Sequence, residues 1–440
     1  MDLAGRARAV LAANRRGAWT CPSSTLYPHQ WLWDSCFIAI GLARDEPTRA
    51  ADELRALFRG QWSDGMLPHM IFAEGVKDFG SRRVWQSKRN PRAPRDVDTS
   101  CITQPPLVAI AVQRVAASLP TGERREFLAE LFPKLIAYHS WLYTARDPER
   151  DGLVTLIHPW ESGLDTSPPW MGALERMPMP WWLRAASTLR LARLLRRLRY
   201  DTRHLPAVER SSDDDGLRML ALAVLTKKYD FDLQRLPPNR AVLIEDLAFN
   251  ALLVVANHAL EEVAADLGED LPAELCTRFR SAEAALESLW DEASGQYFPR
   301  DAVTGALIEV PTIATFFPLW WRGLPAARVA QLVARLQDPS QYWPEHPVPS
   351  VPLDATQFEE ARYWKGPTWV NANWIIIEGL LTHGETALAE SLRGTTVDLV
   401  DAVGSYEYFS PLTGQGHGAD DFSWTAALTI DLLHQRTTRG

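Results

Sequence analysis

The 440-residue chain has little cysteine, no long uninterrupted apolar run and no excess of basic residues. Its four cysteines, Cys21, Cys36, Cys101 and Cys276, form no CxxC pair, which is typical of reduced cysteines in a cytosolic protein. No segment approaches the roughly 18 apolar residues of a membrane span, and the N-terminus lacks the apolar centre of a secretory signal. We therefore expect a cytoplasmic protein with no membrane partner.

Several chemical signatures are also missing. The net charge is -9, from 46 basic and 55 acidic residues, and this argues against a nucleic-acid partner. No set of His, Cys and Asp has the spacing of metal ligands. There is no phosphate-binding glycine loop and no GxSxG nucleophile elbow. We expect neither a catalytic metal nor a cofactor.

Aromatic residues, in contrast, are abundant, with 18 tryptophans and 10 tyrosines. Many of these must lie in the core, but several fall in loop-like segments. The flat faces of Trp and Tyr stack on sugar rings as they do on other apolar surfaces. A small-molecule carbohydrate ligand is therefore a reasonable hypothesis.

The helix pattern predicts an all-α fold. Segments that are apolar on all sides alternate with segments that are apolar on one side, as the inner and outer helices of a ring would be. About a dozen helices in this alternation indicate an (α/α)6 barrel, that is, six helical hairpins, formed by one domain over residues 1–440. Long loops at about 61–103, 147–173 and 337–367 are expected to form a cap over one end. The helices are predicted at 2–14, up to Ala43, 47–60, 102–116, 123–146, 177–199, 213–228, 243–267, 271–292, 368–383, 385–403 and 421–436, with two short ones in 311–336.

The segment HPWESGLDTSPPW (158–170) places two carboxylates among aromatic and proline residues. An apolar environment raises the pKa of a carboxyl group and leaves a proton to donate near neutral pH. We predict that Asp165 is such a donor. For Glu161 we favour a structural role, in which it caps the turn or pairs with an arginine.

A second carboxylate is predicted in the segment SYEYFSP (405–411), where Glu407 lies between two tyrosines. Two carboxyl groups in a sugar-binding cup are the equipment of glycoside hydrolysis, in which one protonates the leaving oxygen and the other activates water or attacks directly. Their separation distinguishes inversion, at roughly 6.5–9.5 Å, from retention, at about 5 Å. Asp34, in YPHQWLWD (27–34), could cap a helix or bind a sugar hydroxyl. His69 and His158 are expected to be hydrogen-bonded loop histidines.

With these residues in view, the chain resembles glycoside hydrolase family 63, and in particular its bacterial mannosylglycerate and glucosylglycerate hydrolases. YPHQWLWDS, ITQPP, PWESGLD, RYWKGPTW and YEYFSP match in order over essentially the whole chain. The resemblance implies the (α/α)6 barrel and an inverting mechanism, with Asp165 as general acid and Glu407 as general base. It places the sugar and aglycone subsites at Tyr27, Trp31, Trp33, Asp34, His69, Gln104, Gly163, Arg210, Tyr363, Trp364 and Trp369.

One stretch departs from the family pattern R-P-T-D-x-D-Y, in which the Arg, helped by the Tyr, holds the glycerate carboxylate. This chain has RSSDDDG, so Arg210 remains but Gly216 replaces the tyrosine. Phe79 stands where another tyrosine hydroxyl would help. A bidentate grip on a carboxylate is still available to Arg210, but a lost hydroxyl partner commonly changes which substrates a site rejects.

The sequence therefore predicts an inverting α-glycosidase that releases a sugar and glycerate from mannosylglycerate or glucosylglycerate. A glycosidase of the same mechanism acting on another small aglycone or a short oligosaccharide is the nearest alternative. A sugar epimerase on a similar barrel would need paired histidines, and none is evident beside the carboxylates. A sugar-binding protein without activity is the non-enzymatic alternative, and the oligomeric state stays open.

Overall fold

Six inner segments close a ring in the computed structural model, which describes residues 1–76, 81–178 and 205–437. Each segment packs against the next, and the last packs against the first. They are α2 (Leu32–Leu42), α5 (Val108–Ser118), α12 (Leu247–Leu267), η5 (Ile313–Trp320), α15 (Val370–Thr382) and α17 (Ser423–Thr437). All eleven residues of α2 are buried, because its neighbours cover it on every side. The predicted (α/α)6 barrel is confirmed.

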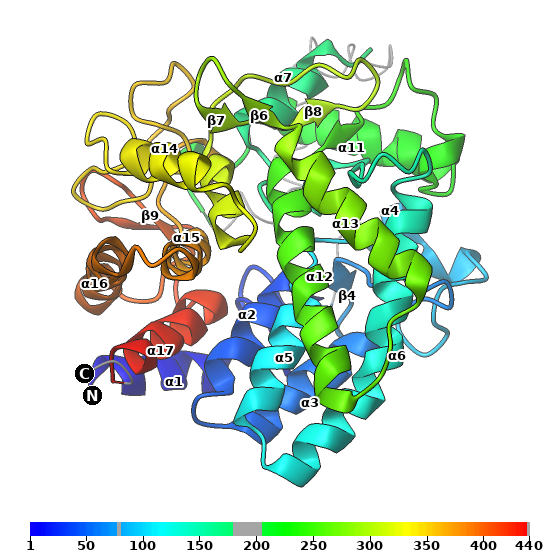
Figure 1. Cartoon of the computed structure of the whole chain (residues 1–440), viewed down its shortest axis with the longest axis horizontal. Helices are drawn as coiled ribbons and strands as arrows, with labels where there is room; N and C mark the ends of the chain where they lie inside the picture. Colours follow the sequence, from blue (N-terminus) through cyan, green and yellow to red (C-terminus); the bar gives the residue numbers. More distant parts are fainter. Residues whose placement is uncertain (77–80, 179–204, 438–440) are drawn as a thin grey trace.

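Each inner segment has an outer partner. The outer helices are α3 (Pro47–Phe58), α6 (Thr121–Ala145), α13 (Ala273–Glu287), α14 (Ala326–Leu336), α16 (Thr386–Val403) and α1 (Leu3–Ala13). Helix α14 shows their pattern, since its buried residues Val329, Leu332 and Leu336 recur at helical spacing on one face. The sixth hairpin joins the two ends of the chain, because α1 packs on α17 (Figure 1).

The fourth inner segment, η5, is a 3₁₀-helix and not an α-helix. Its sequence IATFFPLW contains Pro318, which cannot donate a backbone hydrogen bond and so disfavours a regular α-helix. All eight of its residues are buried, so it still fills its place in the ring between α12 and α15.

Short two-stranded ladders tie the loops together. They are β1 (Arg15–Arg16) with β2 (Trp19–Thr20), β3 (Gln30–Trp31) with β4 (Met70–Ile71), β5 (Ile244–Glu245) with β8 (Arg300–Asp301), β6 (Trp290–Asp291) with β7 (Gln296–Tyr297), and β9 (Tyr408–Phe409) with β10 (Gly416–His417). The β3–β4 pair joins the loop before α2 to the loop 61–103. The β9–β10 pair forms a hairpin directly after Glu407.

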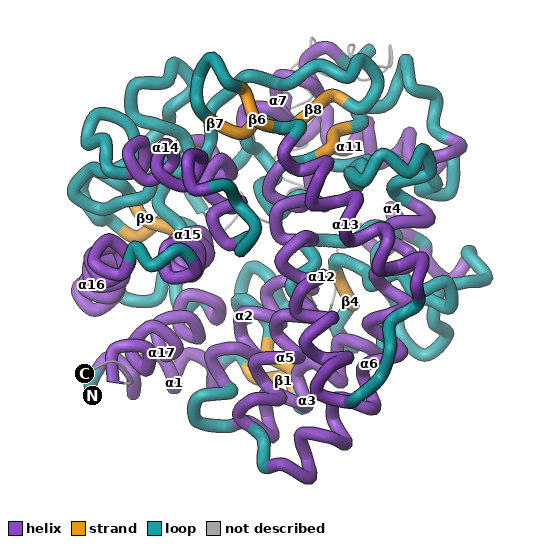
Figure 2. Tube along the Cα trace, viewed as in Figure 1, coloured by secondary structure: helices purple, strands orange, loops and turns teal. Residues whose placement is uncertain are grey.

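The remaining helices lie outside the ring. Helix α11 (Asp213–Lys228) packs on both α4 (Ser81–Trp85) and α7 (Pro168–Arg176). Figure 2 shows that loops and the strands β6, β7 and β8 surround α7 and α11 at the top of the view. Short 3₁₀ turns complete this region, at η1 (Ser87–Arg89), η2 (Pro159–Glu161), η3 (Ala207–Glu209), η4 (Leu233–Arg235) and η6 (Tyr363–Lys365). The single-domain organisation and the cap role of the three long loops stay predictions.

A second apolar cluster fastens these loops to the barrel. It contains Trp62, Met66, Trp85, Ile157 and Phe231, from three widely separated stretches of sequence. Burial of such large side chains stabilises the loops by the hydrophobic effect, at roughly 1.5–3 kcal/mol for each fully buried one. The long loops are therefore packed structures with a core of their own.

Three sequence expectations need correction. Helix α5 begins at Val108, so Pro105 and Pro106 precede it and do not form its first turn. The loop predicted to continue to 173 ends earlier, because α7 begins at Pro168, a residue type suited to the first turn of a helix. Helix α12 is long and apolar enough to cross a membrane by length and composition, although 78% of its most apolar window is buried inside the protein. The helix expected at 177–199 and the position of Phe79 lie outside the described residues.

Candidate active site

The loop that carries Asp165 is anchored by Glu161, which is fully buried. Arg146 grips this carboxylate through both terminal nitrogens, at 2.6 Å from Nη2 to Oε1 and 3.1 Å from Nη1 to Oε2. The backbone amides of Ile157 and Thr103 also donate to it, at 2.7 and 3.3 Å. Such bidentate, charge-assisted pairing fixes geometry as well as adding energy. The expected arginine pairing of Glu161 is confirmed.

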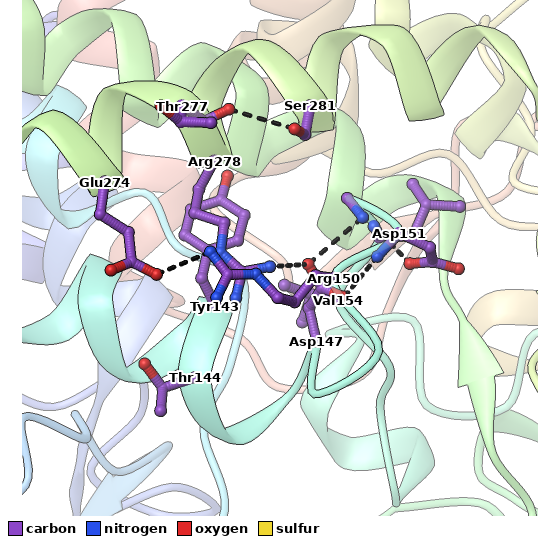
Figure 3. A network of polar contacts seen from close by, with 12 residues as sticks. Tyr143, Thr144, Asp147, Arg150, Asp151, Val154, Glu274, Thr277, Arg278 and Ser281 are labelled. Carbon is purple, nitrogen blue, oxygen red and sulfur yellow. Dashed lines mark hydrogen bonds and ion pairs between the residues drawn. The ribbon is translucent and has the colours of Figure 1, made fainter.

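Asp147, the residue after Arg146, also fixes the end of α6. Asp147 accepts hydrogen bonds from the amides of Asp151 and Gly152, at 3.0 and 3.2 Å, and from Arg278 Nη1 of α13 at 3.2 Å (Figure 3). The end of α6 is thus tied both to the loop of Asp165 and to an outer helix. No cluster of His, Cys, Asp or Glu that could hold a metal occurs in residues 1–76, 81–178 or 205–437.

Gly163 makes the turn that leads to Asp165. Its φ of +71° lies in the left-handed region, and a Cβ there would lie 2.7 Å from two ring atoms of Trp33. Only glycine satisfies both the backbone angle and this close approach without strain. The contribution of Gly163 is therefore to the shape of the loop beside the Trp33 ring.

Asp165 is half-buried, and the described parts of the chain contain no other residue that donates a hydrogen bond to its carboxylate. Burial raises its pKa to about 7, with Arg210 acting in the opposite direction and the charge of Glu407 adding to the rise. A carboxyl group in this state still holds its proton near neutral pH and can donate it.

Asp34 is a third carboxyl group in the same site and is buried in the first turn of α2. The N-cap position belongs to Trp31, so the alternative that Asp34 caps the helix is wrong. Burial raises its pKa well above the usual value, and the charges of Glu407 and Asp165 raise it further. Both effects favour the protonated form of the side chain, which can donate to a ligand oxygen.

Glu407 is buried but surrounded by donors. Tyr27 Oη donates to Oε1 at 2.9 Å and the amide of Ala419 donates to Oε2 at 3.0 Å. Arg210 Nη1 lies between the two oxygens, at 3.4 Å from Oε1 and 3.3 Å from Oε2. Gly418 lies so close that a Cβ there would be 2.5 Å from Oε2. Both carboxylate oxygens of Glu407 therefore accept hydrogen bonds from groups of the protein.

Arg210 joins the aromatic and acidic parts of the site. Its guanidinium lies over the rings of Tyr363 and Tyr27, at 4.5 and 5.6 Å from their centres, and Nη2 also donates to Tyr27 Oη. Such cation–π contacts orient the guanidinium plane as well as stabilising it. The predicted residues Tyr27, Arg210, Tyr363 and Glu407 therefore form one connected cluster.

The predicted tryptophans pack behind this cluster. Trp364 and Trp369 stack face to face with ring centres 3.8 Å apart, and both are buried. Trp33 lies at a tilt 6.4 Å from Trp364. Within the described residues, the indole nitrogens of Trp31 and Trp364 are buried donors that have no acceptor. Buried polar groups are almost always hydrogen-bonded, so these two require an explanation.

His69 and Gln104 support the aromatic wall. Burial lowers the pKa of His69 to about 3, so the ring is neutral, and its Nδ1 lies 2.5 Å from Ser100 Oγ. The ring packs edge-on against Trp31, with centres 5.1 Å apart. Gln104 Oε1 accepts from the amide of Trp33 at 3.4 Å. Both residues thus hold tryptophans in place.

Sequence reasoning missed the residues that hold the loop of Glu407. Glu209, directly before Arg210, accepts from the amide of Gly418 at 3.0 Å and pairs with His417 Nδ1 at 3.1 Å. The hydroxyl of Tyr408 donates to the carbonyl oxygen of Glu209. Residues 209 and 210 together therefore bind the hairpin that follows Glu407. No local pattern announces these contacts, since about 200 residues separate the partners.

Comparison with known proteins gives the same family as the sequence motifs. Residues 27–425 match the model of the mannosylglycerate hydrolase MGH1-like glycoside hydrolase domain. A mannosylglycerate hydrolase of Thermus thermophilus is 42% identical over 96% of this chain and 98% of its own length. A glucosylglycerate hydrolase of Mycolicibacterium hassiacum is 33% identical over 98% of both chains.

A solved structure agrees with this assignment. A family 63 mannosylglycerate hydrolase of Thermus thermophilus, in complex with Tris and D-glycerate, superposes with a TM-score of 0.87 at 39% identity and covers 97% of this chain and 99% of its own. The resemblance predicted from the ordered motifs is confirmed. The chain is a glycoside hydrolase and belongs to the MGH1-like domain family, within glycoside hydrolase family 63.

Proposed function

We propose that this protein hydrolyses mannosylglycerate or glucosylglycerate to the sugar and glycerate with inversion at the anomeric carbon. Asp165 is the general acid that protonates the glycosidic oxygen. Glu407 is the general base that takes a proton from the attacking water. The two relatives that support this substrate class each align over nearly their whole length.

One observation supports the acid and base roles above all others. Asp165 and Glu407 lie close enough that the charge of one raises the pKa of the other, yet their surroundings are opposite. Burial, with no donor from another described residue, raises the pKa of Asp165 to about 7, whereas Tyr27, Ala419 and Arg210 all donate hydrogen bonds to Glu407. A carboxyl group with a raised pKa beside a second carboxyl group that accepts hydrogen bonds suits acid–base hydrolysis of a glycoside.

The remaining polar groups suit a sugar. The indole nitrogens of Trp31 and Trp364 are buried donors without an acceptor among the described residues. A sugar hydroxyl would satisfy such a donor, and the protonated carboxyl group of Asp34 would donate to another hydroxyl. The other predicted binding residues, Trp33, Trp369, His69, Gln104 and Gly163, act in this proposal by shaping and supporting that wall.

The aglycone carboxylate is assigned to Arg210, the buried arginine of the cluster. Gly216 is the fourth residue of α11, whose first turn is closed by a capping box between Ser212 and Asp215. A hydroxyl at position 216 is missing, so a glycoside with another small anionic aglycone stays the main alternative. The cytoplasmic location, the absence of a nucleic-acid partner and the oligomeric state stay predictions.

The experiment is a direct comparison of substrates with product analysis. The purified protein is assayed on mannosylglycerate, glucosylglycerate and a neutral disaccharide, and the anomer first released is identified by NMR. Hydrolysis of one of the two glycerate glycosides to the β-sugar supports the proposal. Release of the α-anomer contradicts inversion, and binding of sugars without any release favours the sugar-binding alternative.

A further inference from the structure

As a general base, Glu407 needs an open position on its carboxylate to take a proton from water. A carboxylate has about four lone-pair directions, two on each oxygen. Oε1 accepts from Tyr27 Oη and Arg210 Nη1, and Oε2 accepts from the amide of Ala419 and the same Arg210 nitrogen. Two donors therefore occupy each oxygen, and one must leave before a water molecule can place its proton there.

Arg210 is the donor most easily displaced. The amide of Ala419 is fixed, because the amide of Glu407 donates back to the carbonyl oxygen of Ala419 at 2.8 Å. Tyr27 is held edge-on between the rings of Trp31 and Phe422, with centres 5.9 and 5.8 Å away. Arg210 approaches Glu407 with one nitrogen, Nη1, at 3.3–3.4 Å, while its other terminal nitrogen donates to Tyr27 Oη. Good charge-assisted pairs are shorter, at about 2.7–2.9 Å.

The proposed substrate carries the group that would displace it. A glycerate carboxylate offers Arg210 a bidentate partner, which is stronger than a long contact from one nitrogen. The rings of Tyr27 and Tyr363 would guide the guanidinium during this exchange, since it lies over both. Movement of Arg210 toward the aglycone would open one lone pair on each oxygen of Glu407.

We infer that Arg210 is an anion-operated latch on the general base: its guanidinium occupies the carboxylate of Glu407 and releases it when an aglycone carboxylate binds. Arg210 is then a residue that determines specificity through the rate of the chemical step as well as through binding. A neutral aglycone would be hydrolysed slowly even when bound, because the base would stay occupied. The inference rests on the proposed acid and base roles, and the assays described for the proposed function test those roles separately.

The test uses a glycosyl fluoride of the sugar that the enzyme accepts, because this substrate leaves the aglycone place empty and its fluoride departs without an acid. Release of free sugar is measured with and without added D-glycerate. We expect glycerate to accelerate hydrolysis by the wild-type protein about tenfold, the effect of freeing one charged hydrogen bond. Glycerol, which lacks the carboxylate, should have no effect. Inhibition by glycerate, or no response to it, would overturn the latch.

A variant of Arg210 tests the latch independently. The latch predicts faster hydrolysis of the fluoride by this variant, whereas a role in binding alone does not. Arg210→Met removes the charge and keeps an unbranched side chain. It should hydrolyse the fluoride faster than the wild type, ignore glycerate, and lose activity on the glycerate glycoside through a higher KM. An unchanged rate on the fluoride would show that Arg210 only binds the aglycone. A lower rate would show that it supports the base.

Arg235→Met is the matched control, because Arg235, which lies on η4, makes an exposed ion pair with Asp230. It should behave as the wild type in every assay. Folding of the Arg210 variant is checked by thermal unfolding. If that variant does not fold, the glycerate response of the wild-type protein alone decides the question.

Discussion

The two loops that carry the carboxylates place their hydrogen-bond donors differently. In the loop of Asp165, the strong donors are all directed at its neighbour Glu161, and Asp165 itself is left half-buried without a donor from another described residue. In the loop of Glu407, the donors converge on the proposed base itself. The difference shows how one site can give two carboxyl groups opposite surroundings, through the placement of arginines and amides.

The largest expected effect is a loss of kcat, and a change of substrate distinguishes the role of the acid from that of the base. Asp165→Asn and Glu407→Gln should each lower kcat on the glycerate glycoside by about 10²–10⁴-fold, the usual contribution of a general acid or base. On a glycosyl fluoride, Asp165→Asn should recover most of its activity, because fluoride leaves without a proton. Glu407→Gln should stay inactive, because water still needs a base.

Equal rescue of both variants on the fluoride would contradict the assignment, and rescue of the Glu407 variant alone would reverse it. Thermal unfolding of each variant distinguishes a loss of chemistry from a loss of fold.

The second effect concerns the anchor of the acid loop. Glu161→Gln leaves the buried guanidinium of Arg146 without its anion, and breaking a buried pair in this way costs about 3–5 kcal/mol. We expect that loss in the free energy of unfolding measured with urea. The matched control is Glu274→Gln, which breaks an exposed pair with Arg150 and should cost less than about 1 kcal/mol. Equal losses in the two variants would show that the Arg146–Glu161 pair does not anchor the loop.

The third effect is on the pH profile. The proposed mechanism requires Asp165 with its proton, and burial raises the pKa of this carboxyl group to about 7. The value of kcat/KM on the glycerate glycoside should therefore fall about tenfold for each pH unit above roughly pH 7. The same limb should be absent with a glycosyl fluoride, which needs no acid. Persistence of the limb with the fluoride would assign the ionisation to a different group.

The same contrast explains what the sequence could and could not predict. Phe37 lies in a helix that is apolar on all sides, and Leu332 lies on the one apolar face of α14, so local sequence predicts the inner and outer helices. The two carboxylates stood out by composition, since an acid among aromatic residues is costly unless it is used.

The contacts between distant parts of the chain were not evident. Tyr27 was expected to bind sugar, but its hydroxyl lies on Glu407, which is 380 residues away. Arg210 was expected to meet a ligand carboxylate, and its pairing with Glu407 was not predicted. Closure of the ring by α1 and α17 was equally hidden. Such pairings depend on tertiary packing, and no local signal in a single sequence encodes them.

The smallest expected effect is a change in Tm, and we expect it to have opposite signs for the variants in the two loops. The pKa of Asp165 rises from 3.8 to about 7 on folding, so its stabilising contribution is complete below pH 3.8 and is lost as the pH rises through 7. Above that pH the buried charge lowers stability, and Asp165→Asn, which is neutral throughout, avoids this loss. Asp165→Asn should therefore gain in Tm relative to wild type between about pH 5 and pH 8. Glu407→Gln should lower Tm at about pH 8, because it removes the carboxylate that pairs with the buried guanidinium of Arg210. A gain in both variants would mean that the donors around Glu407 do not offset the cost of burying its charge, and the contrast between the loops would then fail.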